Sequence, residues 1–289
     1  MDKVLILGAR SFVGQGLPSC LEKMGYVVDT FSRGLKGRVG NAIYGEYCSI
    51  EHNQYFSEAY DAVINLAVLK DQSIEENVAY ICSLIEMCNT HHVKRLIHFS
   101  SVMVYDYQER IVDERTIAER IDVTSKRGYG EIKIAVDAYL DSIRSTLPFE
   151  LIFVRPGYVL ADNRPCPFII NLPLGVHVIK GDKRSKQPIV LREDIHRALA
   201  AIIATEHNNP VYHFFPSDGM TKLRYAQQTV GGVVLTMPKW LFERIPYALA
   251  KLHLIPWSLY SRFQGMYIYS DFQSVQTEQK LQIHFNSLA

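Results

Sequence analysis

A tyrosine and a lysine are spaced so that one can assist proton transfer by the other. In RGYGEIKIAVD, residues 127–137, Tyr129 precedes Lys133 by four positions where an amphipathic helical pattern begins. Residues at i and i+4 share one helix face, with Cβ atoms roughly 6 Å apart. An ammonium there stabilises a phenolate and lowers a phenol pKa that is otherwise about 10. The pair predicts an acid or base that interconverts a carbonyl and an alcohol, although a surface pair is the alternative in a chain with 17 tyrosines.

Two serines supply a second element of such a site. In IHFSSVMVY, Ser100 and Ser101 end a predicted strand, and Ser101 lies 28 residues before Tyr129. A serine hydroxyl at the carboxyl end of a strand can hydrogen-bond a substrate oxygen and place it against the tyrosine. The residues alone do not decide which of the two serines does this.

The elements that must position these groups alternate between strand and helix. Apolar runs predict strands over 4–8, 26–32, 61–68, 95–101 and 150–159, with another near residue 42 and helical patterns between them. Strands separated by helices imply right-handed crossovers and a parallel sheet that is buried on both faces. The sequence therefore predicts an α/β fold with a doubly wound parallel sheet of the Rossmann type. Ligands bind beyond the carboxyl ends of such strands, so residues 8–14, 32–33, 67–72, 100–105 and 156–160 should line one crevice.

The pattern changes after about residue 160, where a Pro-rich, basic stretch begins. We expect a dinucleotide-binding domain over 1–160, with 188–206 returning to the sheet. A smaller C-terminal substrate-binding lobe should occupy 161–187 and 207–289.

One helix of this lobe has an apolar face formed by Leu241, Ile245, Ala248 and Leu252. A lid of the lobe is the favoured interpretation, and a membrane-surface helix is the alternative because basic residues accompany it.

The turn after the first predicted strand has features of a phosphate site. In ILGARSFVGQG, Gly8 permits a tight turn and Gly14 lets helix and strand approach closely, while a helix amino terminus offers N–H groups to a pyrophosphate. Ser11 replaces the usual third glycine; its Cβ would hold the dinucleotide further off, or its hydroxyl would bond a phosphate. This context favours a cofactor site over a plain tight turn.

The end of the second strand indicates which dinucleotide is preferred. Ser32 and Arg33 stand where an acidic residue would bind the ribose hydroxyls of NAD. A guanidinium fits a 2′-phosphate, so NADP is favoured, with NAD as the alternative and a solvated arginine as the non-functional interpretation. Glu46 either reaches the adenine or is simply exposed.

Composition excludes other classes of function. Thirty-one Lys and Arg residues against 30 Asp and Glu give a formal charge of +1 without a basic stripe, which argues against nucleic acid. The five cysteines lack C-x-x-C spacing, and we expect reduced, mostly buried thiols; no histidine has ligand partners at metal spacing. No signal peptide and no apolar stretch of about 20 residues is found, so we expect a cytoplasmic protein without a transmembrane segment.

Taken together, these motifs resemble the extended short-chain dehydrogenase/reductases, also called the NAD-dependent epimerase/dehydratase family. The matching segments, in the order of that family, are LGARSFVG, VINLA, ENV, HFSSVMVY, YGEIK, VRPGYV and VLREDI. The resemblance implies that Ser101 is the catalytic serine, Tyr129 the acid/base, and Lys133 the residue that binds nicotinamide ribose. It also implies hydride transfer at nicotinamide C4, with Asn65 along the cofactor and Gly157 near the nicotinamide, and a homodimer formed by helices near 74–91 and 128–146. The residues expected to contact the dinucleotide are Gly8, Arg10, Ser11, Phe12, Val13, Gly14, Ser32, Arg33, Glu46, Leu66, Ala67, Tyr129, Lys133 and Pro156.

Departures from the family pattern narrow the reaction. Dehydratases of the family carry an Asp-Glu pair where this chain has Val102 and Met103, which argues against dehydration. The basic stretch IKGDKRSKQP suits an anionic substrate, and we expect Lys183 and Arg184, with Ser101 and Val102, to bind it. However, Gln187 replaces the arginine that contacts a diphosphate in relatives that use nucleotide sugars.

These observations leave three hypotheses. The first is an NAD(P)-dependent reductase or epimerase acting on a nucleotide sugar, with an NADP preference. The second is an NADPH-dependent reductase of a hydrophobic ketone, favoured by the aromatic lobe and Gln187. The third is a non-catalytic dinucleotide-binding protein, which would have no use for a lowered phenol pKa.

Overall fold

The computed structural model describes residues 2–105, 111–118, 129–161, 166, 168–206, 211–217, 219–236, 239–256 and 271–286. The chain divides into two compact units. The first comprises Met1–Val104, Ala118–Pro156 and Arg192–Phe214, and the second comprises Tyr105–Ile117, Gly157–Leu191 and Phe215–Ala289.

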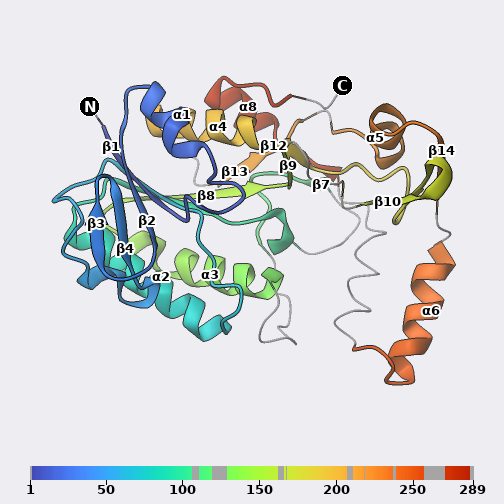
Figure 1. The fold of residues 1–289 in the computed structure, drawn as a ribbon, viewed down its shortest axis with the longest axis horizontal. Helices are drawn as coiled ribbons and strands as arrows, with labels where there is room; N and C mark the ends of the chain where they lie inside the picture. The colour runs from blue at the N-terminus through green and yellow to red at the C-terminus, as the bar shows by residue number, and fades with distance from the viewer. Residues whose placement is uncertain are drawn as a thin grey trace. The chain divides into compact units, whose positions relative to one another are not determined.

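The first unit contains an eight-stranded sheet, which confirms the predicted α/β fold (Figure 1). Its order is β13-β8-β6-β5-β1-β2-β4-β3, and every neighbouring pair is parallel except β3 and β4. The strands are β1 (Lys3–Leu7), β2 (Val27–Arg33), β3 (Gly37–Val39), β4 (Ala42–Gly45), β5 (Ala62–Asn65), β6 (Arg95–Phe99), β8 (Glu150–Pro156) and β13 (Val211–Phe214). Because the central strands are continuous apolar runs, they can be buried on both faces.

Helices cover both faces of this sheet. Helices α1 (Leu17–Lys23) and α4 (Arg192–Ala204) lie on one face, and α2 (Ile74–Thr90) and α3 (Tyr129–Ile143) lie on the other (Figure 1). A capping box between Ser73 and Glu76 fixes the start of α2. The short 3₁₀ segments of this unit are η1 (Tyr47–His52), η2 (Val102–Val104) and η3 (Arg144–Thr146). The resulting core is closely packed, with side chains such as Leu5, Leu84 and Ile132 fully buried.

One strand pairing differs from the sequence prediction for 188–206. Strand β12 (Ile189–Leu191) does not return to the main sheet but pairs with β9 (Tyr158–Leu160), and β13 extends the main sheet instead. Glycine at position 157 permits this pairing, because an added Cβ there would lie 1.9 Å from the Pro188 carbonyl oxygen. The β13 sequence, VYHF, is too short and too polar to stand out as a buried strand.

The second unit has several small sheets around its own core. Strands β10 (Ile169–Leu172), β11 (Val176–Ile179) and β14 (Val233–Thr236) form one sheet, and β15 (Asp271–Phe272) pairs with β7 (Ile111–Val112). Among its described residues the helices are α5 (Lys222–Thr229), α6 (Lys239–Lys251) and α8 (Val275–Leu281), and η4 (Pro173–Gly175) links β10 to β11. Phe168, Ile179, Ile189 and Tyr225 pack together in its core.

The apolar face predicted for 238–263 is not the buried face of α6. Ile245 and Leu252 are 44% and 67% exposed, whereas Pro246 and Ala250 are buried. These two buried residues are four positions apart and so share a face. The apolar spacing predicted the helix but not its buried face, because the buried positions carry a proline and an alanine in place of the large apolar residues.

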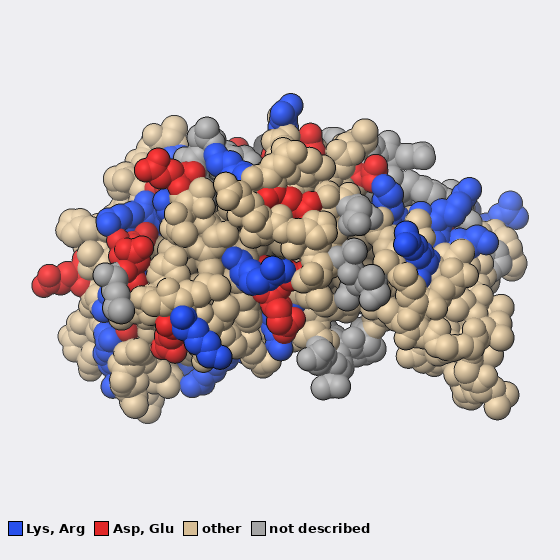
Figure 2. All heavy atoms as spheres, turned by 90° about the horizontal axis from the view of Figure 1, so that it is seen from above, with Lys and Arg blue, Asp and Glu red and all other residues tan. Residues whose placement is uncertain are grey.

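Four further sequence expectations concern the cysteines, membrane-spanning helices, metal ligands and surface charge. Cys88 is the one buried cysteine; Cys48 and Cys82 are exposed and the other two are intermediate, so the prediction of mostly buried thiols was wrong. Within the described ranges, no helix combines the length and apolarity needed to cross a bilayer, and His, Cys, Asp and Glu side chains form no group of three suited to a metal. Figure 2 shows positive and negative side chains interspersed over much of the face that it draws.

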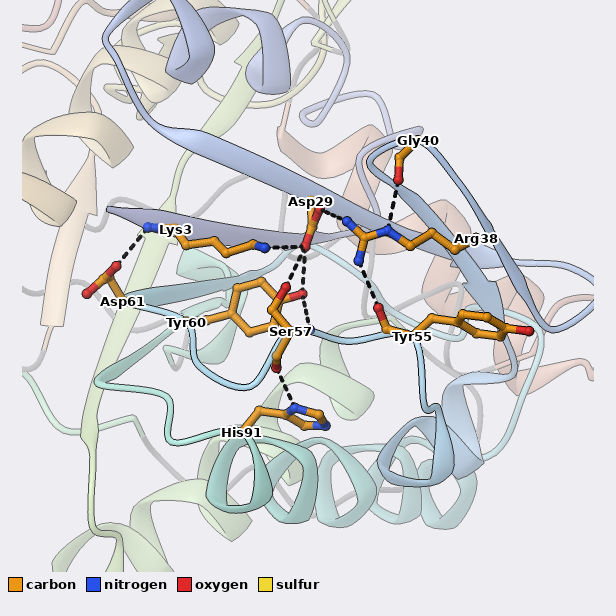
Figure 3. Close-up of polar contacts among 9 residues, drawn as sticks. All are labelled: Lys3, Asp29, Arg38, Gly40, Tyr55, Ser57, Tyr60, Asp61 and His91. Carbon is orange, nitrogen blue, oxygen red and sulfur yellow. Dashed lines mark hydrogen bonds and ion pairs between the residues drawn. The ribbon is translucent and has the colours of Figure 1, made fainter. Parts of the chain in front are cut away.

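The buried carboxylate of Asp29, on β2, pairs with side chains of strands β1 and β3 in the same sheet (Figure 3). Asp29 on β2 accepts a hydrogen bond of 2.8 Å from the Arg38 guanidinium on β3 and another of 2.8 Å from the Tyr60 hydroxyl. The Ser57 hydroxyl and the Lys3 ammonium lie 3.3 and 3.4 Å from the second carboxylate oxygen. Four donors therefore replace the water that Asp29 loses on burial.

Asp29→Asn should lower the free energy of unfolding by about 2–3 kcal/mol, because hydrogen bonds to a buried charge are worth that much and the cations remain. Urea denaturation measures the change. Lys94→Ala is the control, since it breaks an exposed ion pair with Asp61 and should leave the midpoint nearly unchanged. Equal midpoints for the two variants would contradict the role given to Asp29.

Candidate active site

The carboxyl ends of the parallel strands meet at one edge of the first unit. Strand β1 lies between β2 and β5, and the chain continues to β2 and β4 on one side of β1 but to β5, β6 and β8 on the other. This change of direction is the switch point at which open α/β sheets bind ligands. The segments that follow β1, β2, β5 and β6 therefore face a common region.

Close packing explains the two glycines of the turn after β1. Gly8 has a φ of 80°, and an added Cβ would lie 3.0 Å from the Ala67 backbone nitrogen after β5. At Gly14 an added Cβ would lie 2.6 Å from the Gly8 carbonyl oxygen and 2.7 Å from that of Ala9. Side chains at either position would force the backbone of the turn apart, so the turn can take this shape only with glycine.

The turn extends from the end of β1 to the start of α1. The first residue of α1 is Leu17, its N-cap Gly16 has a φ of 84°, and a proline occupies the first turn. The Ser11 hydroxyl accepts a hydrogen bond of 3.1 Å from the Gly14 N–H, and the Gln15 N–H donates to the Ser11 carbonyl. The sequence left two alternatives for Ser11, a Cβ that holds the dinucleotide off and a hydroxyl that bonds a phosphate. The structure shows a third role, because the hydroxyl stabilises the turn itself.

Helix α4 supports the same turn. The Nε2 atom of His196 lies 2.8 Å from the Val13 carbonyl oxygen, and the Arg192 guanidinium lies 5.6 Å from the centre of the Phe12 ring. Burial lowers the pKa of His196, so the imidazole is neutral and donates from Nε2 to Val13. The turn is therefore held from the β1 side and from α4.

Positive charge gathers at the ends of β1 and β2. Arg33 is the last residue of β2 and is exposed, and the Arg10 guanidinium lies 5.6 Å from the Tyr44 ring centre. Burial raises the pKa of Tyr47, and both arginines oppose that rise, so both act on the same neighbourhood. Ser32 is half-buried and Glu46 is exposed. The local field favours an anion.

Lys133 is held under the end of β6. It is buried, and its Nζ donates a hydrogen bond of 2.5 Å to the Phe99 carbonyl, two residues before Ser101. The same Nζ lies 5.9 Å from the centre of the Tyr129 ring. A Cβ added at Gly130 would be 3.6 Å from the Met103 side chain, so the start of α3 lies beside residues 100–104, the serine loop that follows β6. The elements carrying Ser101, Tyr129 and Lys133 are thus adjacent.

The serine loop is ordered by its own hydroxyl. Ser101 is buried, and its Oγ accepts a hydrogen bond of 3.2 Å from the Met103 N–H. The 3₁₀ segment η2 follows and contains Val102 and Met103, neither of which can move a proton. The loop therefore offers one hydroxyl to a substrate, and no acid–base pair of its own.

The pKa values differ from the sequence expectation. Partial burial and, secondarily, the Asp137 carboxylate raise the pKa of Tyr129, and no lowering by Lys133 accompanies them. Burial lowers the pKa of Lys133 to about 8, with Asp137 opposing this effect and Lys70 adding to it. The phenol is therefore protonated at neutral pH, and the lysine titrates close to the physiological range.

Sequence reasoning missed the polar groups beneath this site. Asp137 lies one turn after Lys133 on the buried face of α3, and Arg155 and His98 lie within apolar strands β8 and β6. The available signal was a charged or polar residue inside an otherwise apolar strand or helix face, because such groups are buried only with partners.

The remaining predicted residues are placed as follows. Asn65 and Leu66 are buried and Ala67 is half-buried where β5 ends, and Pro156 ends β8. Lys183 and Arg184 belong to the second unit, are exposed, and lie in a loop where the Arg184 guanidinium is 3.5 Å from Asp182. The Gln187 amide points to the Lys186 carbonyl and the Ser185 hydroxyl, at 3.3 and 3.5 Å.

The residues of the first unit fit a dinucleotide. The space that glycine leaves at positions 8 and 14 and the positive field of Arg10 and Arg33 suit a pyrophosphate and a further phosphate. Backbone at Leu66 and Ala67 lies against the turn. These groups would hold the adenosine and phosphate end, and Lys133 and Tyr129 would face the nicotinamide end.

Solved structures share this fold at low sequence identity. The human epimerase family protein SDR39U1, isoform 2, crystallised with NADPH, matches with a TM-score of 0.68 and 16% identity over 98% of this chain and 95% of that one. MoeE5 in complex with UDP-glucuronic acid and NAD gives 0.67 and 16% over 99% and 94%. The L-threonine dehydrogenase of Phytophthora infestans gives 0.67 and 13% over 99% and 94%.

Comparison with curated protein sequences gives no match. The family model described as "NAD dependent epimerase/dehydratase family" matches residues 4–213, which is well over half of the chain and includes every candidate site residue of the first unit. The resemblance seen in the motifs is therefore confirmed, and the chain belongs to the NAD-dependent epimerase/dehydratase family.

Proposed function

We propose that this protein is an NADP-preferring oxidoreductase that reduces a keto group, or epimerises a hydroxyl, of a nucleotide sugar. The observation that carries the proposal is the placement of Lys133, a buried ammonium bonded to the end of β6 and located on the same helix as Tyr129. A binding module gains nothing from burying a lysine under a serine loop at the cost of desolvation.

The chain's own groups would act as follows in a reduction. Tyr129, which is protonated at neutral pH, donates its proton to the substrate carbonyl oxygen, and the Ser101 hydroxyl bonds to the same oxygen. The Lys133 ammonium then stabilises the phenolate that remains and binds the nicotinamide ribose. The reduced nicotinamide, when bound, supplies the hydride. Because the pKa of Tyr129 is raised, the phenol holds its proton at neutral pH, which is the form that reduction requires, whereas oxidation would require the phenolate.

The NADP preference rests on Arg33 and Arg10 at the ends of β2 and β1. A solved neighbour contains NADPH and another contains NAD, so fold similarity does not separate the two. A guanidinium pairs with a 2′-phosphate through two parallel hydrogen bonds, whereas NAD offers only hydroxyls there.

The nucleotide sugar is supported by the neighbour that binds UDP-glucuronic acid and by the basic loop containing Lys183 and Arg184. A second candidate is the reduction of a non-sugar substrate. It is favoured by Gln187, whose side-chain amide bonds to the adjacent Lys186 carbonyl, and by the neighbour named as L-threonine dehydrogenase. Val102 and Met103 argue against dehydration. We also propose that the protein forms a homodimer and is located in the cytoplasm.

Tyr129→Phe should reduce kcat by at least about 10³-fold and leave the Kd of NADPH within about two-fold, because the phenol moves the proton but carries little of the binding. Stopped-flow turnover and fluorescence titration measure the two quantities, with a panel of nucleotide sugars as substrates. Unaltered turnover would remove Tyr129 from the reaction.

Arg33→Ala should weaken NADPH binding by about 10- to 100-fold and leave NADH binding unchanged, since one charge-assisted pair is worth about 1.5–3 kcal/mol. The control is Lys23→Ala, which removes an exposed positive charge from α1. If the unsubstituted protein bound NADH more tightly than NADPH, the NADP assignment would be wrong.

Gly14→Ala should abolish dinucleotide binding, because the added methyl group collides with two carbonyl oxygens and displaces the turn. Gly37→Ala is the matched control, since its nearest neighbour atom would be 3.8 Å away. Thermal shift with and without NADPH compares the variants, and a full NADPH shift in Gly14→Ala would show that the turn does not bind phosphate.

A further inference from the structure

A cluster of buried polar side chains lies directly beneath the candidate active site. It joins the ends of β5, β6 and β8 to helix α3, and each member is at most 5% exposed. Its members are Asn65, His98, Ser100, Asp137 and Arg155. Buried polar groups in such number require an account of their hydrogen bonds and charges.

Asp137 is the centre of this cluster. Its Oδ2 accepts a hydrogen bond of 2.8 Å from the Ser100 hydroxyl at the end of β6. The same oxygen is 3.0 Å from Nη2 and 3.3 Å from Nε of Arg155 on β8. One carboxylate oxygen therefore connects α3 to two neighbouring strands, next to the residues that carry Ser101 and Pro156.

The other carboxylate oxygen faces a neutral histidine. The Asn65 Oδ1 accepts from the Tyr80 hydroxyl and the Ala67 N–H, which turns its Nδ2 toward His98 Nδ1 at 3.3 Å. The His98 Nδ1 is then the acceptor, and Nε2 carries the hydrogen. This Nε2 is 3.7 Å from Asp137 Oδ1, and neither atom has a hydrogen-bond partner within the described residues.

A second buried cation, Lys133, lies on the same helix as Asp137, the carboxylate of the Asp137–Arg155 ion pair. Burial lowers the pKa of His98 well below its usual value, so the imidazole contributes no positive charge. Lys133 lies one helical turn before Asp137, is also buried, and donates to a neutral carbonyl of Phe99. A buried ammonium needs a counter-charge, and Asp137 is the carboxylate that acts on it.

We propose that Asp137 is a positioning residue of the candidate active site. Its carboxylate holds the ends of β6 and β8 through Ser100 and Arg155, and it is the counter-charge that keeps Lys133 an ammonium under the serine loop. Its catalytic meaning rests on the proposed function, because a charged Lys133 is what stabilises the Tyr129 phenolate.

A purely structural clamp is the competing explanation. In that case Asp137 would hold Ser100 and Arg155 in place and have no effect on the ionisation of Lys133. The groups that act on the two residues from the surrounding elements are Lys70, His98, Tyr129, Arg144 and Arg155. Burial raises the pKa of Asp137, and Arg155, Ser100 and Lys133 oppose that rise.

The test is the pKa of Lys133, measured by NMR on the full chain labelled with ¹³C at the lysine ε-carbon. Lys133→Arg identifies the signal. In the unsubstituted protein the ammonium should be lost as the pH rises through about 8. Asp137→Asn should move this transition to lower pH by about one unit or more, a ten-fold change in the ionisation constant, because an opposite charge is removed.

The matched control is Asp141→Asn, which removes the same charge one turn later on α3 from an exposed residue paired with Arg144. It should leave the Lys133 pKa unchanged. A folded Asp137→Asn protein, checked by near-ultraviolet circular dichroism, with an unchanged Lys133 pKa would overturn the proposal.

If Asp137→Asn does not fold, the ionisation state of Asp137 in the unsubstituted protein tests the proposal. The Asp137 carboxyl carbon, identified through Asp137→Glu, must be ionised at pH 7; a protonated carboxyl there would overturn the proposal. Neither measurement requires turnover. A Tyr129→Phe protein that retained activity would therefore refute the proposed function but would leave the effect of Asp137 on Lys133 to be decided by these two measurements.

In the pH profile of turnover, Asp137→Asn should shift the alkaline limb to lower pH by the same amount as the Lys133 transition, because the active form holds the ammonium. A clamp without electrostatic effect would lower the rate at every pH and leave the limb in place, and that result would contradict the proposal.

Discussion

A single buried carboxylate, that of Asp137, links the ends of two neighbouring strands and lies on the same helix face as a buried lysine. Asp137 bonds to Arg155 and Ser100, and it is the counter-charge nearest in sequence to Lys133 on the same helix face. Removing water from three charges is costly, and the cost is recovered only when geometry and hydrogen bonds are good. The bonds to Asp137 therefore help to hold β6, β8 and α3 together. The candidate catalytic groups Tyr129 and Lys133 lie on α3, and Ser101 follows β6.

The other half of the site depends on steric exclusion more than on charge. The turn after β1 passes so close to itself and to the end of β5 that glycine alone fits at positions 8 and 14. The Ser11 hydroxyl and the α4 histidine, His196, then hold this backbone from within and from outside. The positive field of Arg10 and Arg33 acts on a turn whose backbone is held by these hydrogen bonds, and a preorganised site loses less conformational freedom on binding.

Much of this was readable from the sequence, because it depends on local patterns. Continuous apolar runs separated by helices predicted the parallel sheet, and glycine spacing predicted the turn. The sequence did not predict that β12 leaves the main sheet for β9, since that pairing depends on one close approach at Gly157. It also missed the cluster around Asp137, whose members come from four elements and meet only in the fold. The rise of the Tyr129 pKa was missed for the same reason, because burial is a property of the folded chain.

The proposed reaction requires the side chains of Ser101, Tyr129 and Lys133 to meet around the reactive end of a bound nicotinamide. A crystal structure of the complex with NADP measures this most directly. We expect the Tyr129 phenol oxygen and the Ser101 hydroxyl to face nicotinamide C4 across a common substrate space, with the Lys133 ammonium bonded to the nicotinamide ribose. A complex in which the phenol oxygen points away from that carbon, with no allowed rotamer that brings it back, would contradict the role of Tyr129 as the acid/base.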